Sequence, residues 1–230
     1  MSYIWQDFNI KPFPAETVVF RDGVFCPELS TLESPIISNN YDLPVHFIYV
    51  GELSGKNNLD IIINKNVKNQ KIYLSARVMV KNNAEISLNI ENYGEGSDVR
   101  GFFVIDNHSN VNFDLSAHHL SENTGILIKT RLVAHKNSNS NLTGVAYIDK
   151  NCKNCRSDID FSAMADKGAK IIFRPVQKIS AIPESAAHSA NIAHYSQPQI
   201  EYLHESGLTD IEIEHVLREA FVNNVDLFNE

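Results

Sequence analysis

The stretch that decides the fold, residues 71–92, reads KIYLSARVMVKNNAEISLNIEN. Two segments in which apolar and polar residues alternate, KIYLSARVMV and AEISLNIEN, flank the turn KNNA at 81–84. Alternation at a period of two is typical of a β-strand with one buried face, and clusters of asparagine are typical of turns between strands. The stretch therefore predicts two β-strands joined by a short turn.

The same pattern recurs along the chain. Turns at NHSN (107–110), NSNS (137–140) and DKGA (166–169) each lie between apolar strands, at a spacing of about 26 to 30 residues. Such a period indicates stacked repeats, as in a parallel β-helix in which each coil covers the previous one. An antiparallel sandwich of the same strands is the alternative. The long repeat favours the β-helix.

The repeat divides the chain into three regions. Residues 1–55 place prolines and turn formers between short apolar runs, which predicts an irregular N-terminal cap with short strands. Residues 56–182 carry the strands and form the expected β-helix core. From 183 to 230 the apolar period changes to 3.6, which predicts a C-terminal helical region.

Two helices are expected in this C-terminal region. Ser196 with Gln199, and Thr209 with Glu212, match the capping box that begins a helix, and Gly207 ends the first helix. The second helix carries an apolar stripe composed of Ile213, Val216, Leu217, Ala220 and Phe221. A helix pair of this kind can cover the open end of the β-helix or bind a partner protein.

Composition narrows the classes of partner. The chain has 230 residues, a net charge of -8 and no basic cluster, which argues against nucleic acid or anionic lipid as a partner. Its apolar runs are too short to cross a membrane, and its three cysteines agree with a reducing compartment, so we expect a cytoplasmic protein. Protein or metal partners are favoured.

Two pairs of residues are candidates for chemistry. Cys152 and Cys155 form a C-x-x-C motif, which can bind a metal or form a redox disulfide, although zinc and Fe–S sites usually need a second pair. Nearby Lys150, Lys153 and Arg156 would lower the thiol pKa values; the alternative is a surface turn that contains two cysteines. Asp158 and Asp160 share one face of a strand and suggest a carboxylate groove, or simply a solvated face.

The remaining histidines give a weaker signal. Five histidines have side chains that could ligate a metal, namely His118, His119, His194, His204 and His215. None of them shows the i, i+4 spacing that places two imidazoles on one helix face. Exposed helical histidines are the better interpretation. Nucleotide-binding, hydrolase and metalloprotease motifs are absent from the sequence, and we do not expect an enzyme.

The C-terminal stretch resembles a known family. Residues 187–221, AHSANIAHYSQPQIEYLHESGLTDIEIEHVLREAF, are similar to the C-terminal signature of the SufB/SufD components of the SUF iron–sulfur cluster assembly machinery. The matching positions are His188, Ala190, Gln199, Tyr202, Leu203, Gly207, Leu208, Ala220 and Phe221. Upstream, residues 144–175 look like the last β-helix coil of the same family.

The resemblance implies both a fold and a function. The fold is a right-handed parallel β-helix with a C-terminal two-helix region. The function is that of a non-enzymatic scaffold, in which His188 lies at the interface with a second SufB/SufD-type chain and is a candidate cluster ligand. Family members often carry Cys-x-His where this chain has Ala186 and His188, so a transient Fe–S cluster would be shared with a partner chain and not bound by this chain alone.

The resemblance also assigns the helical region a partner, a SufC-like ABC ATPase. Its docking surface would include Tyr202, Leu203, Gly207, Leu208, Ile213, Leu217 and Phe221. Two other interpretations stay open. One is a carbohydrate-active β-helix enzyme, against which the position of Trp5, the single tryptophan, outside the strands counts. The other is a structural adaptor that has lost cluster chemistry.

Overall fold

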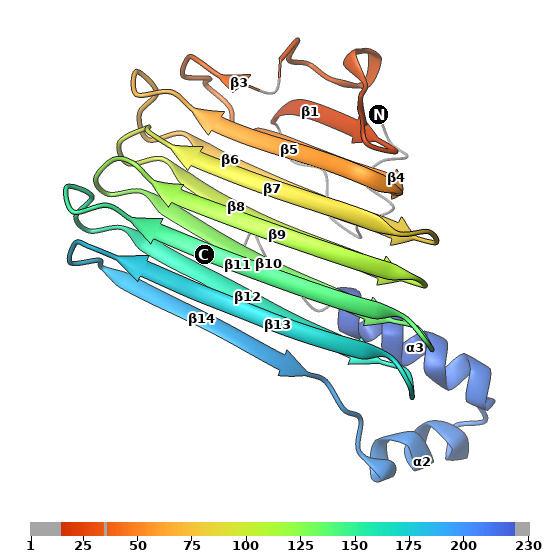
Figure 1. The fold of residues 1–230 in the computed structure, drawn as a ribbon. Coiled ribbons are helices and arrows are strands. Elements are labelled where there is room, and N and C mark those ends of the chain that lie inside the picture. The colour runs from red at the N-terminus through yellow and green to blue at the C-terminus, as the bar shows by residue number, and fades with distance from the viewer. Residues whose placement is uncertain (1–14, 35, 224–230) are drawn as a thin grey trace.

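The strands wind into a parallel β-solenoid of about six turns, which two helices follow (Figure 1). The computed structural model describes residues 15–34 and 36–223. Successive strands alternate between two sheets, so that each coil contributes one strand to each sheet. The predicted β-helix is confirmed, and the antiparallel sandwich is wrong, because neighbouring strands in each sheet run parallel apart from β1 and β2.

The larger sheet has eight strands in the order β14-β12-β10-β8-β6-β4-β1-β2. Its strands are β1 (Glu16–Arg21), β2 (Val24–Phe25), β4 (Val45–Glu52), β6 (Lys71–Val80), β8 (Asp98–Asn107), β10 (Gly125–Ala134), β12 (Arg156–Ala165) and β14 (Ser185–Ile192).

The smaller sheet has six strands in the order β13-β11-β9-β7-β5-β3. Its strands are β3 (Ile36–Ile37), β5 (Gly55–Ile63), β7 (Ala84–Asn92), β9 (Asn110–His119), β11 (Asn139–Ile148) and β13 (Lys170–Ile179). A short 3-10 helix, η1, covers Pro27–Leu29, and the two α-helices are α2 (Gln197–Glu205) and α3 (Asp210–Asn223).

The strand register fixes the length of a coil. Ile36 pairs with Ile62 and Gly125 pairs with Arg156, so one coil takes 26 to 31 residues. Residues one coil apart therefore lie side by side, and their side chains point in the same direction. Every position along a strand becomes a column that runs through the stack.

The solenoid extends beyond the expected core at both ends. β1 pairs in parallel with β4, and β14 pairs in parallel with β12, so the expected boundaries at 55/56 and 182/183 differ from the structure. β1 is one of the short strands expected in residues 1–55, but its place in the solenoid is not evident because turns and prolines separate it from its neighbour in the sheet. In β14 the run SAAHSANI has neither a clear period of two nor a period of 3.6, and the helical region begins only at α2.

Phenylalanine side chains form a column in the core. Phe103 lies 5.2 Å from Phe113, which lies 6.4 Å from Phe161, and Phe161 lies 5.7 Å from Phe173, measured between ring centroids. The first three rings are buried, whereas Phe173 in the last coil is only half-buried. Tilted and edge-to-face rings at these distances attract one another beyond the burial of their area. The column ties the two sheets together.

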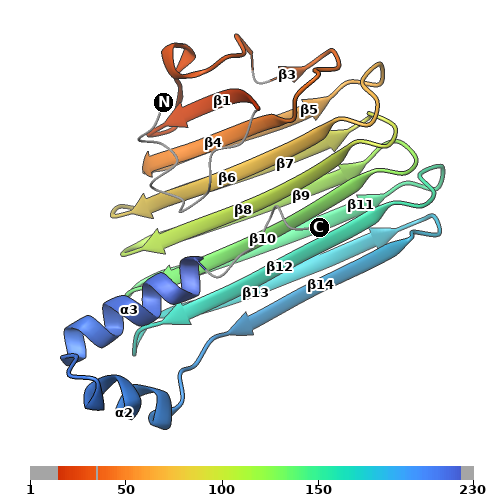
Figure 2. The ribbon, with the colours of Figure 1, turned by 180° about the vertical axis from the view of Figure 1, so that it is seen from behind.

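The helix α3 packs on the outer face of the eight-stranded sheet. Phe221 and Val222 bury themselves against Phe102, Val104 and Val133, which point outward from β8 and β10. The Glu219 carboxylate also accepts a hydrogen bond from Arg77 in β6 at 3.1 Å. Figure 2 shows the C-terminal end of α3 at this face, near the ends of the strands, and the rest of the helix extending toward α2. The helix pair is expected from the sequence either to cover the open end of the β-helix or to bind a partner protein. Because α3 packs on the face of the sheet, it does not cover the open end.

The predicted helix signals are confirmed. The Ser196 N–H donates to Gln199 Oε1 at 2.8 Å, and the Thr209 N–H donates to Glu212 Oε2 at 2.8 Å. These bonds satisfy backbone donors that have no partner within the helix. Gly207 has φ +90°, which permits the left-handed turn between α2 and α3.

A buried histidine lies where the turn after β9 meets the next coil. His119 is fully buried, and its Nδ1 lies 2.8 Å from Thr124 Oγ1, which lies 3.2 Å from Cys155 Sγ. Burial, together with the neighbouring His118, lowers the pKa of His119 to about 4. The imidazole is therefore neutral in the folded protein at neutral pH.

The phenylalanine column generates a stability prediction. Phe113→Ala removes the ring that contacts both Phe103 and Phe161, and we expect it to lower the free energy of unfolding by about 3–5 kcal/mol. Ile172→Ala, at an exposed outward position of β13, is the matched control and should change it by less than about 0.5 kcal/mol. Urea unfolding followed by circular dichroism measures both. Equal losses in the two variants would contradict the role of the column.

His119 generates a prediction about pH. As the pH falls below 6.5, the unfolded chain protonates this histidine while the folded chain does not until about pH 4. Stability is therefore full above pH 6.5 and decreases as the pH falls toward 4. Between pH 7 and pH 5 this one group should account for about 2 kcal/mol of the loss.

The comparison variant is His119→Gln, which should lose less stability than the wild type over that range. Buried His46, whose pKa burial lowers to about 3, acts in the same direction in both proteins and cancels from the comparison. His215→Gln, at an exposed position of α3, serves as the control. Urea midpoints measured from pH 7 to pH 5 test the prediction, and parallel curves for the wild type and His119→Gln would refute it.

Candidate functional site

The last coil of the solenoid forms an open end. β13 and β14 terminate the two sheets, and each has a neighbouring strand on one side only within the described chain (Figure 1). The inward-facing residues Ile171, Phe173 and Pro175 of β13 are half-buried, whereas the equivalent residues one coil earlier, such as Leu142, are buried. A surface with the composition of a core and the free edges of two strands is thus exposed.

His188 lies on this open end. It pairs with Ile159 of β12, whose side chain points into the core and is fully buried. Because paired residues of parallel strands share a direction, the His188 side chain points toward the inner side of the last coil, where it is exposed. Its neighbours in the same direction, Ala186 and Ala190, are small and leave the imidazole accessible.

A single imidazole does not form a metal site. Of the described residues, one group of three histidine, cysteine or carboxylate side chains is close enough to hold an ion, and His188 is not part of it. Ligation at His188 would therefore require donors from outside the described part of the chain.

The thiols of Cys152 and Cys155 are buried in the turn between β11 and β12. They are 3% and 0% exposed, pack beside Ile148, and are not joined by a disulfide. Burial, followed by the neighbouring Cys155 and Asp149, raises the pKa of the Cys152 thiol to about 11. The expected lowering of the pKa by nearby lysines and arginine is therefore wrong for Cys152, because the side chain points away from solvent.

Asp158 and Asp160 both point outward from β12, as their alternation predicts. Burial raises the pKa of Asp158, and the neighbouring Asp160 adds to the shift. Burial also acts upward on Asp160, but hydrogen bonds from Arg131 at 2.9 Å and Ser189 at 2.6 Å outweigh it, so the pKa of Asp160 is lowered. Asp160 is thus an ion-paired carboxylate that links β10, β12 and β14.

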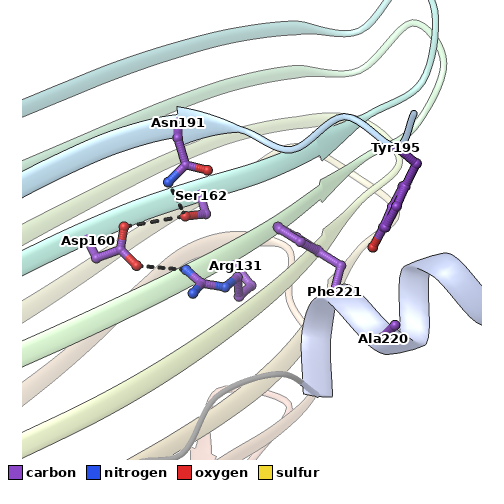
Figure 3. A pocket seen from close by; sticks show the side chains of 7 residues that line it. All are labelled: Arg131, Asp160, Ser162, Asn191, Tyr195, Ala220 and Phe221. Atoms are coloured by element: carbon purple, nitrogen blue, oxygen red, sulfur yellow. Dashed lines mark hydrogen bonds and ion pairs between the residues drawn. The ribbon is translucent and has the colours of Figure 1, made fainter. Parts of the chain in front are cut away.

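A cavity of about 370 Å³ lies next to this carboxylate, between the sheet and α3 (Figure 3). Its polar side chains bond one another or the backbone: Asn191 donates to Ser162 at 2.7 Å, and the Tyr195 hydroxyl donates to the Leu217 carbonyl at 2.8 Å. The Phe221 ring forms the apolar wall of the cavity. The Arg131 guanidinium lies over this ring, 5.8 Å from its centroid. These groups hold α3 and the preceding segment on the sheet.

The other histidines singled out from the sequence lie apart from one another. His118 stacks on Tyr147 on the outer face of the six-stranded sheet, at 4.2 Å between centroids, while His119 is buried. His204 lies 3.1 Å from Asp210 between the helices, and His194 and His215 are exposed. In the described part of the chain these five histidines do not assemble into a metal site.

Sequence reasoning missed the group that does come together, Asp106, His108 and His135. These residues lie where β8 and β10 end and their turns begin. The sequence does contain a signal for them, because His108 and His135 occupy the same position one coil apart. The spacing of the turns does not indicate this group. It is found only when the residue types at the same turn position of successive coils are compared.

The expected docking residues divide into two sets. Tyr202, Leu203 and Leu217 line a shallow apolar groove of about 380 Å³ between α2 and α3, together with Tyr195 and Pro198. The others have structural positions: Ile213 and Phe221 are buried, Leu208 is half-buried, and Gly207 forms the turn. The accessible surface for a partner is therefore the groove, and we call it the α2–α3 groove.

Comparison with protein families gives one match. The family model "SUF system FeS cluster assembly, SufBD core domain" matches residues 57–221, which run from β5 to α3. A search of curated protein sequences finds no match. Among the helices of the described chain, none has the length and apolar character needed to cross a membrane. Since the matched region contains most of the solenoid, the open end and both helices, the chain belongs to the SufB/SufD family of the SUF system for iron–sulfur cluster assembly.

Proposed function

We propose that this chain is a non-enzymatic, cytoplasmic scaffold of iron–sulfur cluster assembly that pairs with a second SufB/SufD-type chain and docks an ABC-type ATPase. The observation that carries the proposal is the open end of the solenoid formed by β13 and β14. Family membership supplies the role in cluster assembly, and the open end supplies the site at which a second chain fits.

The two ends of the solenoid differ in the length of their edge strands. At the N-terminal end the edge strands β2 and β3 have two residues each, whereas β13 and β14 have ten and eight. Short edge strands hinder pairing with another chain, whereas long exposed edge strands favour it. Exposed apolar side chains near the long edges add area to be buried, namely Ile172, Val176, Ile179, Ile182 and Ile192.

Pairing at this end would place His188 between two chains. A neutral imidazole is a ligand for iron, and the remaining ligands to a transient cluster would come from the partner, since Cys152 and Cys155 of this chain are buried. The cluster is then the product carried by the complex, held for part of the assembly cycle. This chain alone would not hold it.

The α2–α3 groove fits the docking of the ATPase. Tyr202 and Ile211 are 69% and 80% exposed at the helix pair, and apolar residues line the groove between the helices. Glu205 and Glu212 leave its surroundings acidic, which would favour a partner with a basic rim. Glu214 and Glu219 contribute less to this charge, because they bond Arg218 and Arg77. The ATPase supplies the nucleotide chemistry for which this sequence has no motif.

The pairing prediction concerns Ala190, which is exposed on the inner side of β14. Ala190→Arg would place a charge in the proposed contact and should weaken pairing at least tenfold. Asn58→Arg, on the exposed outer face of β5, is the matched control and should leave pairing intact. The measurement is anaerobic co-purification from the native host through an N-terminal tag, with the mass of the complex determined by light scattering. Equal recovery of a SufB/SufD-type chain with both variants would contradict pairing at the open end.

The cluster prediction concerns His188. His188→Ala should reduce the iron and sulfide of the anaerobically purified complex at least tenfold while the partner chains remain in the eluate. His118→Ala, which removes a histidine on the other sheet, is the control and should retain the iron. Iron content that is unchanged in His188→Ala would leave a structural adaptor as the correct description of this chain.

The docking prediction concerns the α2–α3 groove. The double variant Tyr202→Asp and Leu203→Asp should remove the ATPase from the eluate, because it places two charges in an apolar contact. Val24→Asp, at an exposed position at the opposite end of the solenoid, should not. Mass spectrometry of the eluate measures how much ATPase co-purifies with each variant. An ATPase that stays bound to the double variant would exclude the groove as its docking surface.

A further inference from the structure

One position of the turn that follows four strands of the eight-stranded sheet, β6, β8, β10 and β12, forms a column near α3. Ala134 pairs with Asn107 on one side and with Ala165 on the other, and Val80 pairs with Asn107. The residues that follow these four therefore stack in successive coils, and they are Lys81, His108, His135 and Asp166. Two imidazoles and a carboxylate are thus brought into one row by the register alone.

Asp106, the next-to-last residue of β8, converges on this row. Asp106 Oδ1 lies 2.6 Å from His135 Nε2 and 3.4 Å from His108 Nε2. The two imidazole rings are stacked, with 3.7 Å between centroids and 11° between planes, so both present Nε2 to the same carboxylate oxygen. One donor atom from each of the three side chains lies within 4.8 Å of the others.

These separations suit a bound ion. Donor atoms that are each about 2.1 Å from a metal in tetrahedral geometry lie roughly 3.4 Å from one another. The distance from Asp106 to His108 already has this value, and the distance from Asp106 to His135 needs to open by less than about 1 Å. Two imidazoles with one carboxylate are a donor set typical of zinc and of non-haem iron(II), and they leave coordination positions open.

The surroundings support the same use. Asp166 Oδ2 lies 3.6 Å from His135 Nδ1, where a carboxylate orients an imidazole whose other nitrogen binds a metal. Asp106 also lines a surface hollow of about 580 Å³, through which an ion can enter. The cations of that hollow are already engaged: Lys81 bonds Glu52 at 2.8 Å and Arg77 bonds Glu219 at 3.1 Å.

We propose that Asp106, His108 and His135 bind a divalent first-row transition-metal ion, with Asp166 positioning His135. The site lies on the turn side of the eight-stranded sheet beneath α3, and it does not use His188 or depend on pairing at the open end. Because Asp166 also accepts a hydrogen bond from Arg218 of α3 at 2.6 Å, a bound ion would fix the turns of two coils and the seat of that helix together.

The test uses the full-length protein, stripped with a chelator and carrying a tag without histidine. Titration with Zn²⁺ by calorimetry, metal analysis after dialysis, and the visible absorption of bound Co²⁺ measure affinity, stoichiometry and coordination. We expect one ion per chain and an increase in thermal midpoint with Zn²⁺. His135→Ala and Asp106→Asn should each weaken Zn²⁺ binding at least tenfold, and Asp166→Asn by about tenfold.

A matched control keeps the result specific. His118→Ala removes a histidine that stacks on Tyr147 and is not part of the Asp106, His108 and His135 group, so this variant should bind Zn²⁺ as the wild type does. Circular dichroism confirms that each variant is folded, and His108→Asn is a second, smaller change at the site. Absence of Zn²⁺ binding by the wild type, or binding that survives in both His135→Ala and His108→Asn, would overturn the proposal.

Discussion

The parallel backbone ladder between coils is the constraint on which the rest of the structure depends. Each inner strand bonds the strands one coil before and one coil after it, and the register repeats every 26 to 31 residues. A shift of one residue would turn every side chain of a strand to the opposite face, and would place the polar outward residues of β12 in the core. The alternation in the sequence and the ladder therefore enforce each other.

Columns of like side chains follow from that ladder. Phenylalanines stack through the core, and asparagines stack along the surface, where Asn139 donates to Asn110 at 2.7 Å and Asn141 donates to Asn112 at 3.0 Å. The row that contains His108, His135 and Asp166 is a third column, and its position at a turn leaves it accessible to solvent. A stacked repeat brings like side chains together in this way, because residues about one coil apart in sequence occupy the same position in successive coils.

The sequence predicts the repeating part of the fold well and its ends less well. Alternation and turn spacing locate β6 to β13, and the capping residues Ser196 and Thr209 locate both helices, because these signals are local. β1 carries a local strand signal, but its pairing with β4, as between Glu16 and Val45, is obscured by the turns and prolines between the two strands. β14 is missed because its run SAAHSANI lacks a clear period of two. The same limit applies to burial: nothing local to the C-x-x-C turn indicates that its thiols point inward, and only the packing around Ile148 shows it.

His188 has an informative sequence context, and the structure adds that it faces the uncovered side of the last coil. Asp106, His108 and His135 have no local motif, since their proximity exists only once two coils are stacked.

The two ends of the solenoid differ, and the proposed pairing with a second chain rests on that difference. At the N-terminal end, two-residue edge strands and side chains such as Phe25, Leu32 and Tyr41 close the core. At the C-terminal end the chain departs from β14 toward the helices, and α3 packs on the face of the sheet, leaving β13 and β14 without a covering strand in the described chain. Exposed strand edges that are not blocked are sites of strand pairing, and this difference between the ends is the reason for proposing the interface at the C-terminal one. The position of α3 is compatible with both proposed contacts, because a helix that packs on the face of the sheet covers neither the edges of β13 and β14 nor the α2–α3 groove.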